Sequence, residues 1–139
     1  MKTVLVLCTG NSCRSQIAEG YLSFYANGRA RIYSAGLEKH GLNPFAVEVM
    51  GEDSIDISDA TSNTVEEIEH SHFDFVLTVC DHAVKNVPVD LSYEHTMHFS
   101  IDDPATAEGS KEEKMAVFRK VREEIKISML KFIGRELIS

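Results

Sequence analysis

The chain has 139 residues, of which 43% are hydrophobic and 26% are charged, and this balance is typical of one globular domain, expected to span residues 1–139. The formal net charge of -8 argues against a nucleic acid or a membrane surface as a partner, because both are anionic. A small anion is compatible with this charge, since a local cradle of backbone N–H groups can overcome a distant field that salt screens.

The first predicted elements are a buried strand and an amphipathic helix. Residues 3–7 are apolar or β-branched without alternation, as expected for a strand covered on both faces of a parallel sheet. Residues 15–26 carry apolar side chains at helical spacing, and residues 30–34 form a second short strand candidate. The chain is therefore expected to begin with a strand, a helix and a strand.

A helix is predicted to start at Asn43 and Pro44, because Asn is a good N-cap residue and Pro favours the first helical position. Gly51 is expected to end this helix. A short helix is expected at residues 63–68, where two glutamates favour the first turns.

The second half of the chain adds two strands and a long helix. Residues 73–80 read FDFVLTVC and predict a strong strand, and residues 96–99 predict a fourth. Pro104 disfavours helix at the residue before it, so the DDPATAEGS segment is expected to be a loop. Residues 111–137 predict a long amphipathic helix, because their apolar side chains recur at helical spacing.

Strands that alternate with helices predict an α/β three-layer sandwich with a central parallel four-stranded sheet. Sheets of this kind place their functional sites at the carboxyl ends of the strands. Cys8 and Cys80 both stand at such ends. We therefore expect the two thiols to face one pocket.

The segment CTGNSCRS, which follows the first strand, carries what an oxyanion site needs. Gly10 permits close backbone approach and a positive φ, and Asn11 also tolerates the left-handed conformation. The helix that follows adds free N–H groups, and Arg14 offers a planar fork for two oxygens. The same positive field is expected to lower the pKa of Cys8 from its usual ~8.5, and Ser15 is placed to donate to the thiolate.

The three cysteines form no CxxC pair and lack the clustered spacing of a zinc site, so free thiols are expected. The sequence has no apolar run long enough to span a bilayer and no signal-peptide pattern, which favours a cytoplasmic location. Cys8 read alone is equally a small buried hydrophobe. Its context of strand, glycine turn and helix favours the chemical interpretation.

The segment CTGNSCRS, a cysteine and an arginine separated by five residues, resembles the loop of the low-molecular-weight protein tyrosine phosphatases. A longer set of motifs is more similar to the arsenate reductases built on that phosphatase fold. These motifs are CTGNSCRSQ followed by AEG, SAG at 34–36, TS at 61–62, TVCDHA at 78–83 and DDPA at 102–105. The resemblance covers nearly the whole chain and implies a low-molecular-weight phosphatase-like fold.

The resemblance implies roles for particular residues. Cys8 would attack arsenic, and Arg14 would bind the oxyanion together with the loop amides. Asp103 would be the general acid for the leaving group, although DDP by itself is a common turn. Cys80 would attack the sulfur of Cys8, expel arsenite and leave a disulfide. The implied substrate-binding set is Thr9, Gly10, Asn11, Ser12, Cys13, Arg14 and Ser15.

Val87 is the main departure from the family pattern. Thioredoxin-coupled members carry a third redox cysteine before a proline, whereas here Val87 precedes Pro88. Cys13 is a weak substitute, because it lies inside the anion loop. Three explanations stay open: a Cys8–Cys80 disulfide reduced directly by thioredoxin or a low-molecular-weight thiol, a protein that is chiefly a phosphatase, or an engineered valine that traps an intermediate.

The implied chemistry requires no cofactor, but the family has a cation site that often holds potassium. Asn11, Glu19, Ser34 and Thr61 match its ligands. Asn63 stands where some members carry aspartate, and the loss of a carboxylate weakens a site for a hard cation. The alternative for Glu19 is a solvated helix residue.

The leading hypothesis is an arsenate reductase that uses Cys8, Cys80 and an external thiol donor. The alternative is a tyrosine phosphatase that hydrolyses phosphomonoesters through a Cys8 phosphoenzyme, although the acid loop has only Tyr93 nearby. A third interpretation is a non-catalytic oxyanion-binding module. The expected partners are a small oxyanion (arsenate, phosphate or sulfate) and thioredoxin or a similar reductant, and a monomer is expected.

Overall fold

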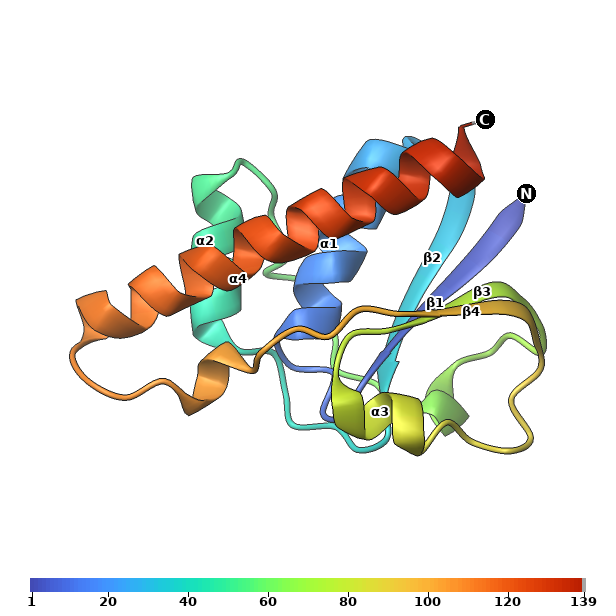
Figure 1. Ribbon diagram of the computed structural model, residues 1–139, viewed down its shortest axis with the longest axis horizontal. Coiled ribbons are helices and arrows are strands. Elements are labelled where there is room, and N and C mark those ends of the chain that lie inside the picture. The colour runs from blue at the N-terminus through green and yellow to red at the C-terminus, as the bar shows by residue number, and fades with distance from the viewer. Residues whose placement is uncertain (139) are drawn as a thin grey trace.

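The computed structural model describes residues 1–138, and a four-stranded sheet lies at its centre (Figure 1). The strands are β1 (Lys2–Cys8), β2 (Ala30–Gly36), β3 (Phe73–Thr78) and β4 (Tyr93–His98). Their order across the sheet is β2-β1-β3-β4, and every neighbouring pair is parallel. The predicted parallel four-stranded sheet is confirmed.

Helices cover both faces of this sheet. They are α1 (Arg14–Ala26), α2 (Pro44–Glu52), α3 (Asp81–Lys85) and α4 (Lys111–Phe132), with the 3₁₀ turns η1 (Val65–Glu67) and η2 (Pro104–Thr106) and the π turn η3 (Ile133–Leu137). Figure 1 shows α1, α2 and α4 on one side of the sheet and α3 and η1 on the other. Right-handed crossovers between parallel strands produce these layers, and the predicted three-layer α/β fold is confirmed.

Strand β1 lies in the middle of the core, because it pairs with β2 on one side and with β3 on the other. Val4, Leu5, Val6 and Leu7 are fully buried, which explains an apolar run without alternation. The burial of this strand fixes the position of its last residue, Cys8.

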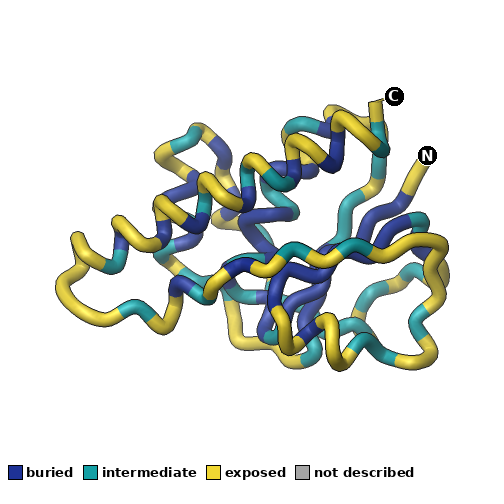
Figure 2. The backbone as a smooth tube through the Cα atoms, in the orientation of Figure 1, coloured by how far each residue is buried: buried dark blue, intermediate teal, exposed yellow. Residues whose placement is uncertain are grey.

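The edge strand β4 is mostly exposed, as Figure 2 shows. It begins at Tyr93, earlier than the predicted start at residue 96, because an exposed edge strand does not need an apolar pattern. The sequence does not predict helix α3, since its five residues DHAVK are mostly polar and only Ala83 is buried. The α3 helix follows Cys80 directly, so its position bears on the second thiol.

The start of α2 agrees with the prediction, whereas its end does not. Asn43 Oδ1 accepts a hydrogen bond from the N–H of Phe45 at 2.8 Å, and Pro44 occupies the first turn. The helix continues through Gly51 to Glu52, because Gly51 lacks the positive φ of a C-terminal glycine cap.

Helix α4 is the long amphipathic helix that the sequence predicts, although its α-helical part ends at Phe132. A reciprocal pair of hydrogen bonds between Ser110 and Glu113, each at 3.2 Å, caps its start. Its buried face consists of Met115, Phe118, Val121, Ile125, Met129 and Phe132. Among residues 1–138, no helix is long and apolar enough to cross a membrane.

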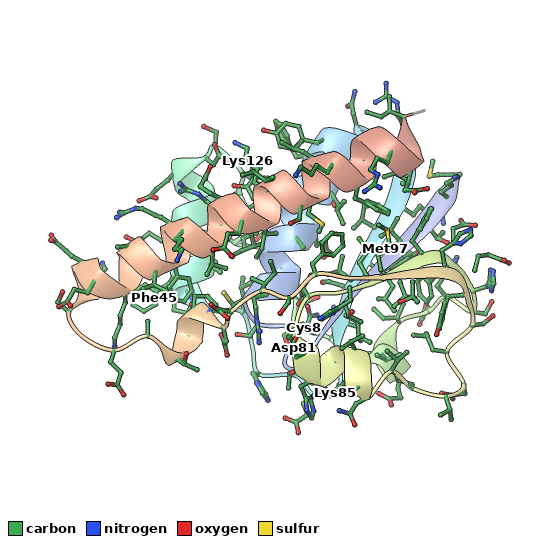
Figure 3. All side chains as sticks on the ribbon, in the orientation of Figure 1. Cys8, Phe45, Asp81, Lys85, Met97 and Lys126 are labelled. Atoms are coloured by element: carbon green, nitrogen blue, oxygen red, sulfur yellow. The ribbon has the colours of Figure 1, made fainter. Side chains whose placement is uncertain are left out.

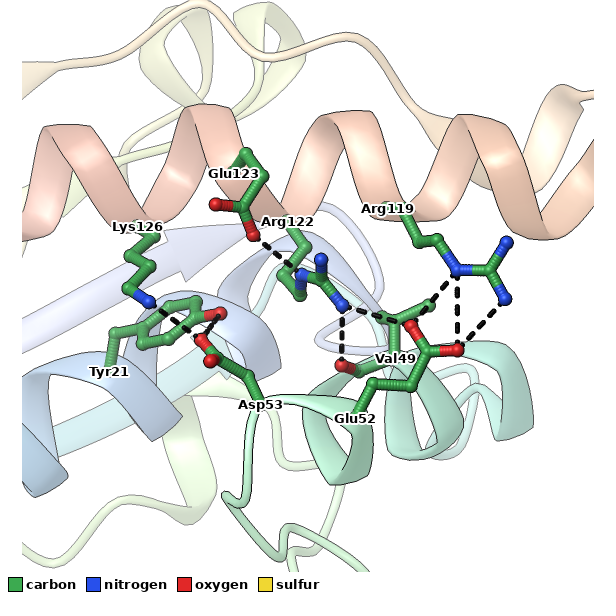
Figure 4. A network of polar contacts seen from close by, with 8 residues as sticks. All are labelled: Tyr21, Val49, Glu52, Asp53, Arg119, Arg122, Glu123 and Lys126. Carbon is green, nitrogen blue, oxygen red and sulfur yellow. Dashed lines mark hydrogen bonds and ion pairs between the residues drawn. The ribbon is translucent and has the colours of Figure 1, made fainter.

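A network of ion pairs and hydrogen bonds ties α4 to α2 (Figure 4). Arg122 Nη1 donates to the Val49 carbonyl and to Glu52, each at 3.0 Å. Arg119 makes a bidentate contact with Glu52, with its shortest N···O distance at 2.8 Å. Because an arginine fork holds a carboxylate in one orientation, these contacts fix α4 against the end of α2.

Asp53 extends this network to α1, and replacing it is expected to lower stability in a pH-dependent way. The buried Tyr21 hydroxyl donates to Asp53 at 2.8 Å, and Lys126 Nζ donates at 2.9 Å. The hydrogen bond from Lys126, then that from Tyr21, holds the pKa of Asp53 below its usual value. Its contribution is therefore complete above the unfolded-state pKa of about 3.9 and is lost as the pH falls through the lower folded-state pKa.

The expected result for Asp53→Asn is a loss of about 1.5 kcal/mol in the free energy of unfolding at neutral pH. Urea titrations at neutral pH and at about pH 3 measure this loss, which should shrink at the lower pH. Asp59→Asn, at an exposed position, is the matched control. An Asp53→Asn loss of equal size at both pH values would contradict the assignment.

Candidate active site

The loop from Thr9 to Cys13 connects β1 to α1 at the carboxyl edge of the sheet. Its carbonyl groups are bound by the surrounding protein, largely by the segment that follows β2. The donor–acceptor pairs, with their N···O distances, are Leu37–Cys8 (3.2 Å), Glu38–Thr9 (2.9 Å), His40–Gly10 (2.9 Å), Gln16–Asn11 (3.1 Å) and Asn43–Ser12 (3.0 Å). The acceptor side of the loop is therefore satisfied.

Most N–H groups of this loop, unlike its carbonyl groups, lack hydrogen-bond partners among the described residues. In the part of the chain that the structure describes, no hydrogen bond uses the N–H groups of residues 10 to 13. Gly10, Asn11 and Cys13 are buried, and a buried N–H without an acceptor costs free energy. An oxyanion in the loop would supply the acceptors, and the N-terminus of α1 favours its negative charge. The loop thus has the chemistry of an oxyanion cradle.

The loop conformation confirms the close approach expected at Gly10 but not the positive φ. The left-handed residue is Asn11, with a φ of 47°, and Gly10 is needed for space instead, because a Cβ there would lie 2.2 Å from Nδ1 of His40. Gly36 of the SAG motif also provides space, since its Cβ would lie 2.2 Å from the Glu38 carbonyl oxygen. Both glycines allow the end of β2 to pack closely on the loop.

Ser15 binds Asn11 rather than Cys8, which corrects a second expectation. The Ser15 hydroxyl donates to Asn11 Oδ1 at 2.7 Å. The amide nitrogen of Asn11 donates in turn to the carbonyls of Ser34 at 3.3 Å and Asn63 at 3.4 Å. Asn11 and Ser15 are fully buried, so these bonds hold the left-handed turn in place.

Arg14 is the first residue of α1 and reaches toward the segment before η2. Its Nη1 donates to the Ile101 carbonyl at 2.9 Å, and its Nη2 lies 3.7 Å from Oδ2 of Asp103. Asp103 also caps η2, because its Oδ1 accepts from the N–H of Ala105 at 3.0 Å. The structure therefore brings the expected arginine and the expected acid together, and the same aspartate shapes the turn.

A cavity of about 200 Å³ opens over the loop, with Cys8, Arg14 and Asp103 in its lining. His40 also lines this cavity, and no sequence motif points to it. The surrounding sequence, HGLNP, predicts only that a helix begins nearby. The packing of its ring against Gly10 is a tertiary contact, which no local pattern predicts.

Cys80 lies next to Cys8 at the start of α3. Its sulfur accepts a hydrogen bond from the N–H of Ala83 at 3.4 Å, and the Thr9 hydroxyl lies 3.2 Å away. Cys8 and Cys80 also lie close enough that each thiol shifts the pKa of the other, with Cys8 as the donor toward Cys80. The structure thus brings together two thiols that are 72 positions apart in the sequence, counted as 80 minus 8.

The pKa values of the two thiols are shifted in opposite directions. The hydrogen bond from Cys8, aided by those from Thr9 and Ala83, lowers the pKa of Cys80 to about 5. The same hydrogen bond, followed by burial, raises the pKa of Cys8 and outweighs the attraction of Arg14. The pKa of Cys8 is raised and not lowered as expected, because the expectation considered the loop and Arg14 but not a second thiol close by.

The Cys13 thiol differs from the thiols of Cys8 and Cys80 in its surroundings. Burial, and then the charge of Asp103, raises its pKa to about 12. The thiol is 5% exposed and stays protonated at neutral pH, so it faces the cavity as a neutral group. Cys13 is accordingly a poor redox nucleophile.

Residues 3–138 match the family described as low molecular weight phosphotyrosine protein phosphatase. The chain belongs to this family. Among its members, a protein named arsenate reductase from Halalkalibacterium halodurans is 50% identical over 124 residues, which cover 89% of each chain. Another arsenate reductase, from Shouchella clausii, is 47% identical over 131 residues, or 94% of each chain. A solved structure described as an arsenate reductase in the phosphate binding state has a TM-score of 0.84 at 33% identity, covering 97% of this chain and 98% of that one.

The residues expected to bind a cation in this family lie on the other side of the loop. Ser34 Oγ donates to Glu19 at 3.0 Å, whereas the Thr61 hydroxyl donates to Asn63 at 3.4 Å. Burial raises the pKa of Glu19, so this residue is not the solvated alternative. Gln16, one turn earlier on α1, has a buried Oε1 without a hydrogen-bond partner among the described residues, and it lines a cavity of about 510 Å³ together with Glu19.

Proposed function

We propose that this protein reduces arsenate to arsenite, with Cys8 as the thiol that binds arsenic and Cys80 as the second thiol. The observation that carries the proposal is the adjacency of the Cys8 and Cys80 thiols, each of which shifts the pKa of the other, beside a loop in which the N–H groups of residues 10 to 13 have no acceptor among the described residues. Hydrolysis of a phosphate ester uses the loop and one thiol, whereas a two-electron reduction uses both. The names of the curated relatives support the same assignment.

In the first step, arsenate binds in the loop, where the N–H groups of residues 10 to 13 and the guanidinium of Arg14 contact its oxygens. Cys8 passes its proton to the Cys80 thiolate and attacks arsenic. An S–As bond forms and an As–O bond breaks. Dihydrogen arsenate brings the second proton: Asp103 takes it from one arsenate oxygen and passes it to the leaving hydroxyl, which departs as water.

In the second step, the sulfur of Cys80 attacks the sulfur of Cys8. The S–S bond forms as the S–As bond breaks, and the electron pair of the S–As bond stays on arsenic, which changes from As(V) to As(III). Two thiols are oxidised to one disulfide, and the proton of Cys80 leaves with arsenite. Because a disulfide requires an S–S distance of about 2.05 Å, α3 must carry Cys80 closer to the loop.

An external thiol must then reduce the disulfide. Val87 occupies the position of the third redox cysteine and packs partly buried against the core, so it transfers no electrons. The donor therefore acts on the Cys8–Cys80 disulfide itself, next to the exposed helix α3 (Figure 2). Thioredoxin or a low-molecular-weight thiol in a reducing cytoplasm is the proposed donor. All the proposed residues come from one chain, so a monomer suffices.

The decisive experiment compares reductants. Purified protein with arsenate and either a thioredoxin system or glutathione is expected to release arsenite. Mass spectrometry of protein quenched after arsenate alone should find the Cys8–Cys80 disulfide. Val87→Cys is expected to raise turnover with thioredoxin, because the new thiol can pass the disulfide outward. If the protein releases no arsenite and forms no disulfide with either donor, the proposal is refuted.

Phosphomonoester hydrolysis is the second candidate, because Arg14 and Asp103 line the same cavity as Cys8. The first step would be the same attack on phosphorus instead of arsenic, and water would then release phosphate. An aryl phosphate assay under the same conditions separates the two functions. Strong hydrolysis without arsenite release would favour the phosphatase.

The proposal includes a monovalent cation beside Glu19. A buried carboxylate with a raised pKa and the unpartnered Oε1 of Gln16 line one cavity, and this oxygen-only donor set suits a hard cation. Glu19, Gln16 and Ser34 would hold the ion, which would neutralise the buried charge behind the loop.

Thermal unfolding tests this cation site. Potassium chloride is expected to raise the Tm by a few degrees relative to choline chloride at equal ionic strength, because the ion binds only the folded state. Glu19→Gln should abolish this difference, whereas Glu69→Gln, at an exposed position, should keep it. An equal Tm in both salts for the unaltered protein would rule the site out.

A further inference from the structure

Helix α3 carries Cys80 at its start but is weakly embedded in the protein. It has five residues, and only Ala83 is buried. A helix this short is not stable by itself, so side-chain contacts must hold it in position. Figure 3 shows Asp81, its first residue, at the same end of the sheet as Cys8.

Three side chains outside α3 form a chain of hydrogen bonds that ends on Asp81. The Thr78 hydroxyl, at the end of β3, lies 2.8 Å from Nδ1 of His98 at the end of β4. Nε2 of His98 lies 2.9 Å from Oδ1 of Asp81. The Ser100 hydroxyl donates to the same oxygen at 3.1 Å.

The chemistry of these groups sets the direction of the hydrogen bonds. An ionised carboxylate accepts only, so Nε2 of His98 carries the hydrogen that is donated to Asp81. In the neutral ring, Nδ1 is then the acceptor for the fully buried Thr78 hydroxyl. The hydrogen bonds from His98 and Ser100 lower the pKa of Asp81, in agreement with donation to its charged form.

The hydrogen bonds on Asp81 also come close to the anion site, through Ser100. Ser100 immediately precedes Ile101, whose carbonyl accepts the 2.9 Å hydrogen bond from Arg14. A movement of Asp81 is expected to displace the Cys80 sulfur next to it in the chain, whereas Arg14 is held by the main-chain carbonyl of Ile101 and not by a side chain of this set. The ends of β3 and β4 are rigid by comparison, because both strands belong to the sheet.

We propose that Asp81 and His98 are positioning residues for the second thiol step: they hold the start of α3 so that the Cys80 sulfur faces Cys8. This inference rests on the proposed function. Attack on a sulfur requires an aligned nucleophile, and a displacement of about 1 Å can cost up to about 100-fold in rate. Neither residue transfers an electron or touches the substrate.

The test measures the formation of the Cys8–Cys80 disulfide after a single addition of arsenate. Asp81→Ala and His98→Ala are each expected to slow it by about ten-fold or more. The Kd for inorganic phosphate, measured by calorimetry, should change by less than about two-fold, because the loop N–H groups are unaltered. His98→Gln should recover part of the rate, since its amide can donate to Asp81.

Two controls distinguish positioning from helix stability alone. Asp90→Ala removes the same charge from the exposed segment after α3 and should keep the original rate. His98→Ala leaves the favourable carboxylate of Asp81 at the helix N-terminus, so an unchanged rate in this variant would show that Asp81 acts only on the helix dipole. Such a result, or a parallel loss of phosphate binding, would overturn the inference.

An oxidant separates this inference from the proposed function. If the unaltered protein forms no disulfide with arsenate, the proposed function fails. Diamide, which oxidises neighbouring dithiols without arsenate, then reports on the positioning of Cys80. A slower closure by diamide in Asp81→Ala and His98→Ala supports the inference, and an equal or faster closure refutes it.

Discussion

Cys80→Ser is expected to lower arsenate turnover by about 10³-fold or more, while inorganic phosphate continues to bind. The hydroxyl of serine cannot attack the Cys8 sulfur, so the S–As adduct has no resolving thiol in the protein. The N–H groups of the loop and Arg14 are unchanged by the substitution, and therefore the oxyanion still binds. Steady-state arsenite release and phosphate calorimetry measure the two halves of this prediction.

Cys13→Ser is the matched control for this substitution. Cys13 is as buried as the redox pair, and its raised pKa of about 12 keeps it protonated at neutral pH. Arsenate turnover in this variant is expected to stay within about three-fold of the original, because no electron passes through Cys13. Full arsenate turnover in Cys80→Ser would refute the two-thiol mechanism, whatever the control shows.

Cys8→Ser is expected to abolish arsenate reduction and any aryl phosphate hydrolysis together, each by about 10⁴-fold or more. Both reactions begin with attack by the Cys8 sulfur, and a serine hydroxyl in this loop has no base strong enough to activate it. Assays of both substrates on one preparation measure the loss. Retention of either activity would show that the corresponding reaction does not begin at Cys8.

Cys8→Ser also tests which of the two thiols has the lower pKa. A serine hydroxyl at position 8 can still donate to Cys80, so the Cys80 thiolate is expected to persist and to titrate near its pKa of about 5. The ultraviolet absorbance of the thiolate, followed against pH in Cys8→Ser, measures it. In Cys80→Ser, by contrast, the remaining thiolate should be that of Cys8 and should be sensitive to Arg14. A single thiolate in Cys8→Ser that titrates near the ordinary thiol pKa would contradict the assignment of the charge.

Local patterns were sufficient for the elements with strong hydrophobic periodicity. β1 is read from an apolar run because it is buried on both faces, and α4 from a regular apolar stripe because one of its faces packs on the core. The Asn43–Pro44 start of α2 follows from cap chemistry, which acts within a few residues. The sequence does not show α3, since five mostly polar residues carry no periodic signal.

The residues of the candidate site also divide into those that local motifs predict and those that only the structure shows. The roles of Cys8 and Arg14 follow from the chemistry of a local loop between a strand and a helix, whereas the acid role of Asp103 comes only from the family resemblance, since DDP by itself predicts a turn. Sequence alone allowed a positive φ at Gly10 or at Asn11; the structure places it at Asn11, and packing against His40 shows that Gly10 is needed for space.

The sequence by itself thus determined the parallel α/β architecture and the anion loop, because each depends on residue type and short-range spacing. Only the tertiary structure showed that the pKa of Cys80 lies below that of Cys8, that Ser15 binds Asn11 and that His98 contacts Asp81 at the start of α3. These features depend on distances between segments that are far apart in the chain. The pKa values of the two thiols are the clearest case, since they are set by the groups that converge on each sulfur after the chain has folded.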